Sequence, residues 1–391
     1  MPLTSGRARS VQAPIIPQVA EWIRSHPGTL SLGQGIAGYP PPPEALAEVA
    51  RLHTEPQLHR YQPVEGLPEL LEALWIKLSR DNGIRPGPDQ VLMVTAGANV
   101  AFQQIILALC DPGDEVILPL PYYFNQDMAL ALANVRTVCV PGDRRLHPDV
   151  DALSRAITPR TRAIVTVSPN NPTGAVYPEE TLRAVNELCQ SRGLLHISDE
   201  TYEDFTHDGI RHLSPGSFPG ASGHTVSLFS LSKAYGFASW RMGYVVYPAE
   251  LRDAMRKIQD TLLICPPVVS QLAAIGCLKA GKPWLRERLA SVADVRHRVL
   301  AQLEGLHDLA QWPAADGAFY VYLRLPGGGD PMDLARRLIE HHRVAVIPGT
   351  AFGETRECTL RVAYGALTPE GAEEGLSRLV GGLRALCRRT C

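Results

Sequence analysis

Short apolar runs alternate with amphipathic stretches between about residues 65 and 275, and this pattern predicts the fold. The runs are rich in β-branched residues and apolar along most of their length, which is typical of parallel strands buried on both faces of a sheet. Seven runs fit this description: 90–96, 115–120, 135–140, 163–168, 194–198, 225–230 and 243–248. Alternation of strands and helices predicts an α/β domain whose mostly parallel seven-stranded sheet is covered by helices.

Four stretches between these strands are predicted to be helices, at 99–110, 121–133, 178–193 and 249–263. The third has the expected start and stop signals. It begins with Pro178, two acidic residues follow, and it ends at Gly193.

The C-terminal third has a different pattern, which predicts a small α+β unit. Its expected elements are a helix at 283–304, a strand at 317–325, a helix at 331–342, short strands at 344–349 and 358–365, and a helix at 369–387. The segment before the proline run at 40–44 is predicted to be a loop-like arm. We therefore expect a large domain at 46–280 and a small domain formed by the N-terminal arm, 1–45, together with 281–391.

Composition narrows the classes of function. The chain has 391 residues, of which 45% are hydrophobic and 20% charged, and a net charge of −2. There is no basic excess to indicate nucleic acid or an anionic membrane surface, and the apolar runs are too short to span a bilayer. The N-terminus has no apolar core typical of a signal peptide, and the eight scattered cysteines form no C-x-x-C pair. We expect a cytoplasmic protein with reduced thiols and no metal site.

Small, polar or ionisable residues follow four of the predicted strands. The sequences at these strand ends are TAGAN, SPNNPTG, DETY and SLSK. In open α/β sheets, ligands bind beyond the carboxyl ends of the strands. Packing alone does not account for four such ends, so we expect a ligand site there.

Taken singly, each of these residues has an ordinary explanation. Gly97, Ala98 and Asn99 open a helix where an anion would be favoured, but most such turns are plain caps. Asn171 fits a turn. Asp199 ends an apolar strand, where a carboxylate needs a cationic partner such as a protonated heterocycle nitrogen, although it also fits a helix cap.

Lys233 presents a similar choice. It is one of only five lysines in the chain, and Arg241 follows it in an otherwise uncharged stretch. Lys233 is either a solvated surface lysine or a lysine that forms a Schiff base beside a phosphate-binding arginine. Tyr202, three residues after Asp199, is either a core residue or part of the same local turn.

Together, these motifs resemble the fold-type I, pyridoxal-phosphate-dependent aminotransferases of class I and II. The resemblance covers nearly the whole chain. Within the class, the chain is most similar to the branch that holds kynurenine/glutamine-type and broad-range bacterial aminotransferases. The matching stretches are LSLGQGIAGYPPPPE, HRYQPVEGLPELLEAL, TAGAN, SPNNPTG, SDETY, SLSKAYGFASWRMGY and TLRVAYG.

The resemblance implies roles for the residues at the strand ends. Lys233 binds the cofactor as a Schiff base and then moves the substrate proton, which requires a depressed lysine pKa. Asp199 pairs with the pyridine nitrogen and keeps it protonated. Asn171 and Tyr202 donate hydrogen bonds to the ring oxygen of the cofactor. Tyr123 stacks on the cofactor ring, although its neighbour Tyr122 is an alternative.

The resemblance also implies two anion sites. The phosphate is bound at the turn of Gly97 by the Ala98 and Asn99 amides, the Ser230 hydroxyl and Arg241. The substrate carboxylate is bound by Arg361, near Asn171, and Gly35 lets the N-terminal arm approach it. Tyr61 reaches the phosphate of a neighbouring subunit, so a homodimer with shared sites is expected. The sequence departs from many relatives at Ala37, where they have proline, and the arm continues with Gly38 and Tyr39.

The expected function is transfer of an amino group between an α-amino acid and a 2-oxo acid by ping-pong kinetics. A pyridoxal-phosphate-dependent β-lyase, a synthase or an oxygen-using enzyme remains an alternative, because reaction choice depends on small pocket differences. A ligand-sensing regulator is a remote one, because few residues precede LSLGQG and none forms a basic recognition helix.

The expected donor is a neutral amino acid with a large or amide side chain rather than aspartate. The stretch 259–267 is expected to wall the distal pocket of the neighbouring subunit, and it contains Leu263 and Ile264 but no arginine. Asp260, in the same stretch, would suit a donor with a cationic side chain, although it also fits a helix-end cap.

Overall fold

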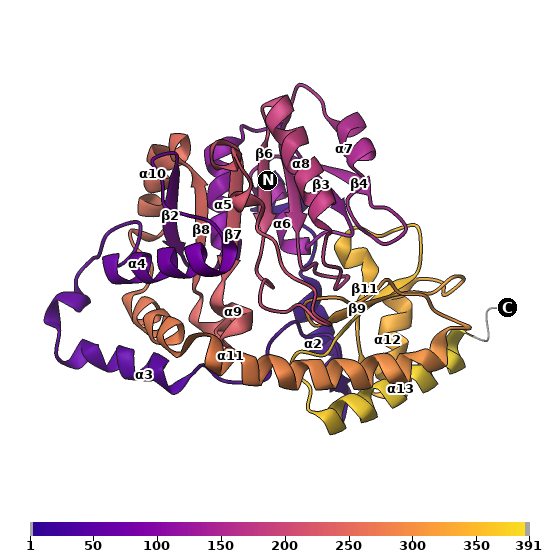
Figure 1. Cartoon of the computed structure of the whole chain (residues 1–391). Coiled ribbons are helices and arrows are strands. Elements are labelled where there is room, and N and C mark those ends of the chain that lie inside the picture. Colours follow the sequence, from indigo (N-terminus) through magenta and orange to yellow (C-terminus); the bar gives the residue numbers. More distant parts are fainter. Residues whose placement is uncertain (1–2, 388–391) are drawn as a thin grey trace.

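A seven-stranded sheet forms the centre of the structure, a computed structural model that describes residues 3–387 (Figure 1). Its spatial order is β2-β8-β7-β6-β5-β3-β4. The strands are β2 (Gln90–Thr95), β3 (Glu115–Leu120), β4 (Arg136–Pro141), β5 (Thr161–Val167), β6 (Leu195–Asp199), β7 (Thr225–Ser230) and β8 (Gly243–Pro248). All seven coincide with predicted strands, and the predicted α/β fold class is confirmed.

Two strands differ from the expectation of buried parallel strands. Strand β8 runs antiparallel to both β2 and β7, whereas the remaining neighbours are parallel. An apolar run does not encode direction, because both kinds of ladder bury the same side chains. Strand β4 lies at the edge, and Arg136 and Cys139 on it are exposed.

Helices cover both faces of this sheet because successive strand side chains point to opposite faces. On β2, Val91 and Met93 pack with helices α5, α6 and α10, whereas Leu92 and Val94 pack with α4 and α11. Around the parallel strands, α7 and α8 pack on the second face. The bounds are α4 (Pro68–Lys77), α5 (Ala98–Leu109), α6 (Phe124–Leu132), α7 (Val150–Ala156), α8 (Glu179–Arg192), α9 (Leu231–Ala234), α10 (Arg252–Leu263) and α11 (Val268–Leu303).

A second layer is built from the C-terminal third and the N-terminal arm. Its three-stranded antiparallel sheet has the order β11-β12-β9, and β1 pairs in parallel with β10. In Figure 1 the orange helix α11 runs toward α13, against which it packs. The bounds are β1 (Leu30–Ser31), β9 (Tyr320–Arg324), β10 (Val344–Ala345), β11 (Ile347–Pro348), β12 (Thr359–Ala363), α12 (Pro331–His342) and α13 (Pro369–Cys387).

The prediction of a loop-like N-terminal arm is wrong. The arm contains α1 (Gly6–Ser10) and the amphipathic helix α2 (Ile15–Ser25), and α3 (Pro43–Val49) begins inside the proline run. Helix α2 buries Ile15 and Val19 against residues of α12 and β11, and this packing stabilises it.

The division into two domains remains a prediction. Near its expected boundary, Gly281 interrupts α11 with a non-helical backbone (φ 58°, ψ −153°). Among the described residues no single helix is long and apolar enough to cross a membrane, and one bent pair, Ala249–Leu263 with Val268–Leu306, meets that test by length and composition only.

Candidate active site

A cavity of about 500 Å³ lies where the strand ends of the large sheet meet the second layer. Residues at the carboxyl ends of β5, β6 and β7 line it, as do the first residues of α5, which is where ligands bind in open α/β sheets. The predicted site residues that line it are Gly35, Ala98, Asn99, Tyr123, Asn171, Asp199, Tyr202, Ser230, Lys233, Arg241 and Arg361. Sequence reasoning therefore brought together residues that the fold places around one cavity.

Lys233 is not a solvated surface lysine. It is partly buried on the one-turn helix α9, whose start is capped by Ser230. Its Nζ donates a hydrogen bond to the carbonyl oxygen of Gly35 at 2.5 Å. Burial, reinforced by the positive charges of Arg361 and Arg241, lowers the pKa of Lys233 to about 8. Its amine therefore loses a proton far more readily than an ordinary lysine.

Asp199 is the carboxylate of the site, and it is only 6% exposed at the end of β6. Its oxygens accept hydrogen bonds from the Gln126 side chain at 3.1 Å and from the backbone N–H of Thr201 at 3.2 Å. Burial raises the pKa of Asp199. A buried carboxylate held by neutral donors favours a cationic ligand, because a cation would offset the cost of its charge.

The start of α5 and Arg241 form an anion-binding corner. Gly97 has φ +92°, and a Cβ there would come within 2.4 Å of Nη2 of Arg241. Gly97 itself does not line the cavity, but it leaves room for the guanidinium beside the free amides of Ala98 and Asn99. Unpaired N–H groups at a helix start favour anions, and a phosphate fits this arrangement. Ser230 adds a hydroxyl to the same cavity.

Arg361 lies on β12 and is only 2% exposed. Its Nη1 donates to Oδ1 of Asn171 at 2.8 Å, and its Nη2 donates to the carbonyl oxygen of Gly33 at 2.7 Å. Its Nε has no hydrogen-bond partner among the described residues. A buried guanidinium with an unused donor that lines a cavity fits a carboxylate ligand.

The structure separates the two candidate stacking tyrosines. Tyr123 lines the cavity, and its hydroxyl accepts a hydrogen bond from Asn125 at 2.7 Å. Tyr122 packs in the hydrophobic core between the sheet and α6. Tyr61 is different again, because it is 80% exposed and does not line the cavity of its own chain.

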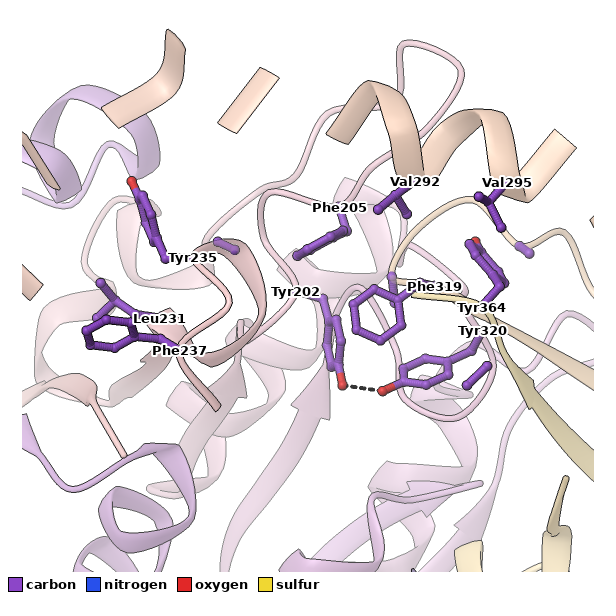
Figure 2. Packing of buried hydrophobic residues seen from close by; sticks show 14 of the residues in the cluster. Tyr202, Phe205, Leu231, Tyr235, Phe237, Val292, Val295, Phe319, Tyr320 and Tyr364 are labelled. Atoms are coloured by element: carbon purple, nitrogen blue, oxygen red, sulfur yellow. Dashed lines mark hydrogen bonds between the residues drawn. The ribbon is translucent and has the colours of Figure 1, made fainter. Parts of the chain in front are cut away.

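Several residues of the site were missed by sequence reasoning. Tyr320 lines the cavity and its hydroxyl lies 2.5 Å from that of Tyr202 (Figure 2). Gln126 holds Asp199, and Tyr39, in the departing segment of the arm, donates to the carbonyl oxygens of Lys233 and Ala234 at 3.2 and 3.1 Å. No local pattern marks these residues, because each acts across a long stretch of sequence.

The family follows from comparison with known proteins. A family model described as aminotransferase class I and II matches residues 27–379. This chain belongs to the class I and II aminotransferase family.

Curated relatives and solved structures agree with this assignment. An aromatic aminotransferase of Arabidopsis thaliana is 36% identical, with 98% of this chain and 97% of the relative covered. An aspartate/prephenate aminotransferase of Thermus thermophilus is also 36% identical, with coverage of 87% and 88%. Among structures, an aromatic aminotransferase from Pyrococcus horikoshii has a TM-score of 0.85 at 31% identity, covering 95% of this chain and 100% of that one.

The chain is therefore an aminotransferase that acts on amino acids and 2-oxo acids and uses pyridoxal phosphate, the cofactor of its family. The cavity fits this cofactor on independent grounds. It offers a lysine of lowered pKa, a buried carboxylate that forms no salt bridge among the described residues, and an anion corner that a Cβ at Gly97 would fill. Its volume is also within the range of ordinary cofactor pockets.

Proposed function

We propose that this aminotransferase acts on neutral amino acids with large side chains, aromatic ones included, rather than on aspartate. The observation that carries the proposal is the number of cations in the cavity. Within residues 3–387 the lining contains three: Lys233, Arg241 and Arg361. Cofactor attachment, cofactor phosphate and substrate α-carboxylate would occupy them all, so this chain's described lining leaves none for a distal carboxylate, and the stretch 259–267 expected from a neighbouring subunit contains no arginine.

The outer part of the cavity supports the same proposal. Pro14, Ile16, Pro17 and Ile36 line it, and they offer apolar surface. Burying a large apolar side chain is worth roughly 1.5–3 kcal/mol, whereas an unpaired distal carboxylate would lose at least that much. The relatives include aromatic as well as aspartate/prephenate aminotransferases, so the names of the relatives do not decide between a neutral donor and aspartate. The apolar side chains of the cavity support a neutral donor.

A screen of half-reactions tests the donor. Purified holoenzyme is mixed with each amino acid in turn, and the absorbance change to the amino form of the cofactor is followed. Phenylalanine, methionine or glutamine should exceed aspartate roughly tenfold to a hundredfold in kcat/KM, because only neutral side chains are buried without an unpaired charge. A clear preference for aspartate would refute the proposal. A preference for arginine would also refute it and point to Asp260, which Asp260→Asn would test.

We propose the following roles around the cofactor. When bound, pyridoxal phosphate supplies an electron sink for the substrate Cα carbanion. Asp199 would hold a proton on the ring nitrogen, and Asn171 and Tyr202 would donate to the ring oxygen. Lys233, whose lowered pKa makes it a base near neutral pH, would carry the proton to and from Cα.

The remaining residues of the site would bind and orient. Tyr123 would stack on the ring, and Arg361 would hold the α-carboxylate with two parallel hydrogen bonds. Gly35 would keep the arm close, since a Cβ there would lie 2.3 Å from the Tyr320 hydroxyl. The phosphate would be bound at the turn of Gly97 by Ala98, Asn99, Ser230 and Arg241.

We also propose a homodimer in which Tyr61 completes the neighbouring site. The exposed apolar residues Leu262, Ile264 and Val269 support a partner surface. Buried glutamines tie this stretch to the Tyr61 segment, because Gln259 donates to the carbonyl of Val64 and Gln271 accepts from the N–H of Leu67. The two segments therefore form one continuous surface.

Mixing two inactive variants tests the shared site. Tyr61→Ala and Lys233→Ala should each be impaired alone. Mixed dimers should regain one native site, because both lesions fall in the other site. Activity is measured after subunit exchange confirmed by native mass spectrometry, and each variant mixed with itself is the control. No recovery, or a wild-type monomer at working concentration, would contradict the shared site.

The domain division and the location are proposals as well. We propose 46–280 as the cofactor-binding domain and 1–45 with 281–391 as the arm and small substrate-closing domain, and the break of α11 at Gly281 supports a hinge there. We propose a cytoplasmic location, supported by cysteines that form no disulfide at Cys110, Cys139, Cys189, Cys265, Cys277 and Cys358.

A further inference from the structure

We propose that Tyr320 is a positioning residue that donates a hydrogen bond to the Tyr202 hydroxyl and so directs the proton of Tyr202 toward the cofactor. Its hydroxyl lies 2.5 Å from that of Tyr202, and both side chains line the cavity. The inference rests on the proposed role of Tyr202 as a donor to the ring oxygen of the cofactor.

The two tyrosines come from different layers of the fold. Tyr202 follows strand β6 of the large sheet, and Tyr320 begins β9 of the three-stranded sheet. Figure 2 shows their rings nearly edge to face with the hydroxyls directed at each other. The ring centroids are 5.4 Å apart at an interplanar angle of 74°. Phe319 packs against both rings and leaves little freedom for either.

The surroundings fix the place of the Tyr320 hydroxyl. Gly35 lies so close that a Cβ would meet the Tyr320 oxygen at 2.3 Å, and Arg361 stacks over the Tyr320 ring at 4.6 Å. Both tyrosines are buried. A buried hydroxyl needs a hydrogen-bond partner, and Tyr202 is the partner that the structure gives to Tyr320.

The donor direction follows from proton counting. Each hydroxyl has one proton, and two hydroxyls in contact use one proton between them. If Tyr202 gives its proton to the ring oxygen of the cofactor, the proton between the tyrosines belongs to Tyr320. Donation from Tyr320 stabilises negative charge on the Tyr202 oxygen, which makes Tyr202 a stronger donor in turn.

Charged groups around the pair act on the same proton. Lys233 lies 5.9 Å from the Tyr202 ring, and Arg361 lies over Tyr320. Tyr123 interacts electrostatically with both tyrosines. Asp199, at the end of β6, interacts with Lys233 and Tyr123. Arg361 favours negative charge on either oxygen, whereas burial opposes it and raises the pKa of Tyr202.

The test compares single-oxygen deletions in the holoenzyme. The absorbance of the holoenzyme reports the pKa of the linkage between Lys233 and the cofactor. A weaker hydrogen-bond donor at Tyr202 would leave more negative charge on the ring oxygen of the cofactor. That charge would hold the proton of the linkage more tightly. Tyr202→Phe should therefore raise this pKa. Tyr320→Phe should raise it in the same direction by about half to one pH unit, the size of one net hydrogen bond. In a Tyr202→Phe background, Tyr320→Phe should add nothing.

Tyr364→Phe is the matched control. Tyr364 is buried in the same aromatic cluster, its hydroxyl has no hydrogen-bond partner among the described residues, and it does not line the cavity (Figure 2). This variant should titrate like the wild type, whereas a shift as large as that of Tyr320→Phe would show a general packing effect and overturn the inference. In steady-state kinetics, Tyr320→Phe should lower kcat with little change in KM.

The outcomes separate the inference from the function on which it rests. An unshifted Tyr202→Phe enzyme would overturn the role of Tyr202 itself. A shifted Tyr202→Phe enzyme with an unshifted Tyr320→Phe enzyme would overturn only the inference. A further shift in the double variant would also overturn it, since Tyr320 would then act on the cofactor directly. So would a raised KM without a change in the titration, since Tyr320 would then contact the substrate.

Discussion

Replacing Lys233 with alanine should abolish transamination while leaving a folded protein that still binds pyridoxal phosphate. The side chain is the one amine of lowered pKa in the described cavity lining, and its loss would remove both the proposed covalent attachment and the proposed base. Loss of a positioned general base alone costs roughly 10²–10⁴-fold in rate. Asp199, Arg241 and the α5 amides remain, so the cofactor should still be retained without covalent attachment.

Two measurements check this expectation. The absorbance of the variant with cofactor should match that of the free aldehyde, and peptide mapping of borohydride-reduced wild type should find the cofactor on Lys233. Lys257→Ala is the control, because Lys257 is exposed on α10 and should behave like the wild type. A tag on any other lysine would refute the assignment.

The residues around the cavity could be predicted from the sequence because they lie in local motifs at strand ends. The runs before Asp199 and Ser230 are apolar enough to predict buried strands, and the polar residue that follows each must lie at a sheet edge. Their convergence on one cavity then follows from the parallel ladder, in which β5, β6 and β7 end on the same side. Roles within the cavity came from the family resemblance instead.

Contacts between distant segments were not readable in this way. Tyr320 is an ordinary aromatic in a strand, and only the tertiary fold brings it to Tyr202, which follows β6 of the other sheet. Gln126 on α6 meets Asp199 for a similar reason. Helix α2 was missed although its apolar residues recur at helical spacing, and tertiary packing of Ile15 and Val19 stabilises it. The proposed role of Tyr61 depends on a second chain, and Tyr61 does not line the cavity of its own chain.

Replacing Asp199 with alanine should lower kcat by at least about 10²–10³-fold, the scale for loss of one preorganised electrostatic partner. The buried carboxylate is held in place by Gln126 and Thr201 and forms no salt bridge among the described residues, so a protonated ring nitrogen would be a partner that fits it. Without the carboxylate, the variant would no longer hold a proton on that nitrogen, and the cofactor would stabilise negative charge at the substrate Cα less well in the transition state.

Asp199→Asn separates charge from shape, since the amide keeps the size of the side chain but cannot favour a protonated nitrogen. It should lose activity nearly as severely as alanine, whereas Asp199→Glu should recover part of it. Asp151→Ala, which removes an exposed carboxylate in the first turn of α7, should leave kcat unchanged. Single-turnover absorbance with cofactor content matched among the variants gives the rates. Near-normal turnover in Asp199→Asn would exclude charge as the function of Asp199, because that variant removes the charge and keeps the size of the side chain.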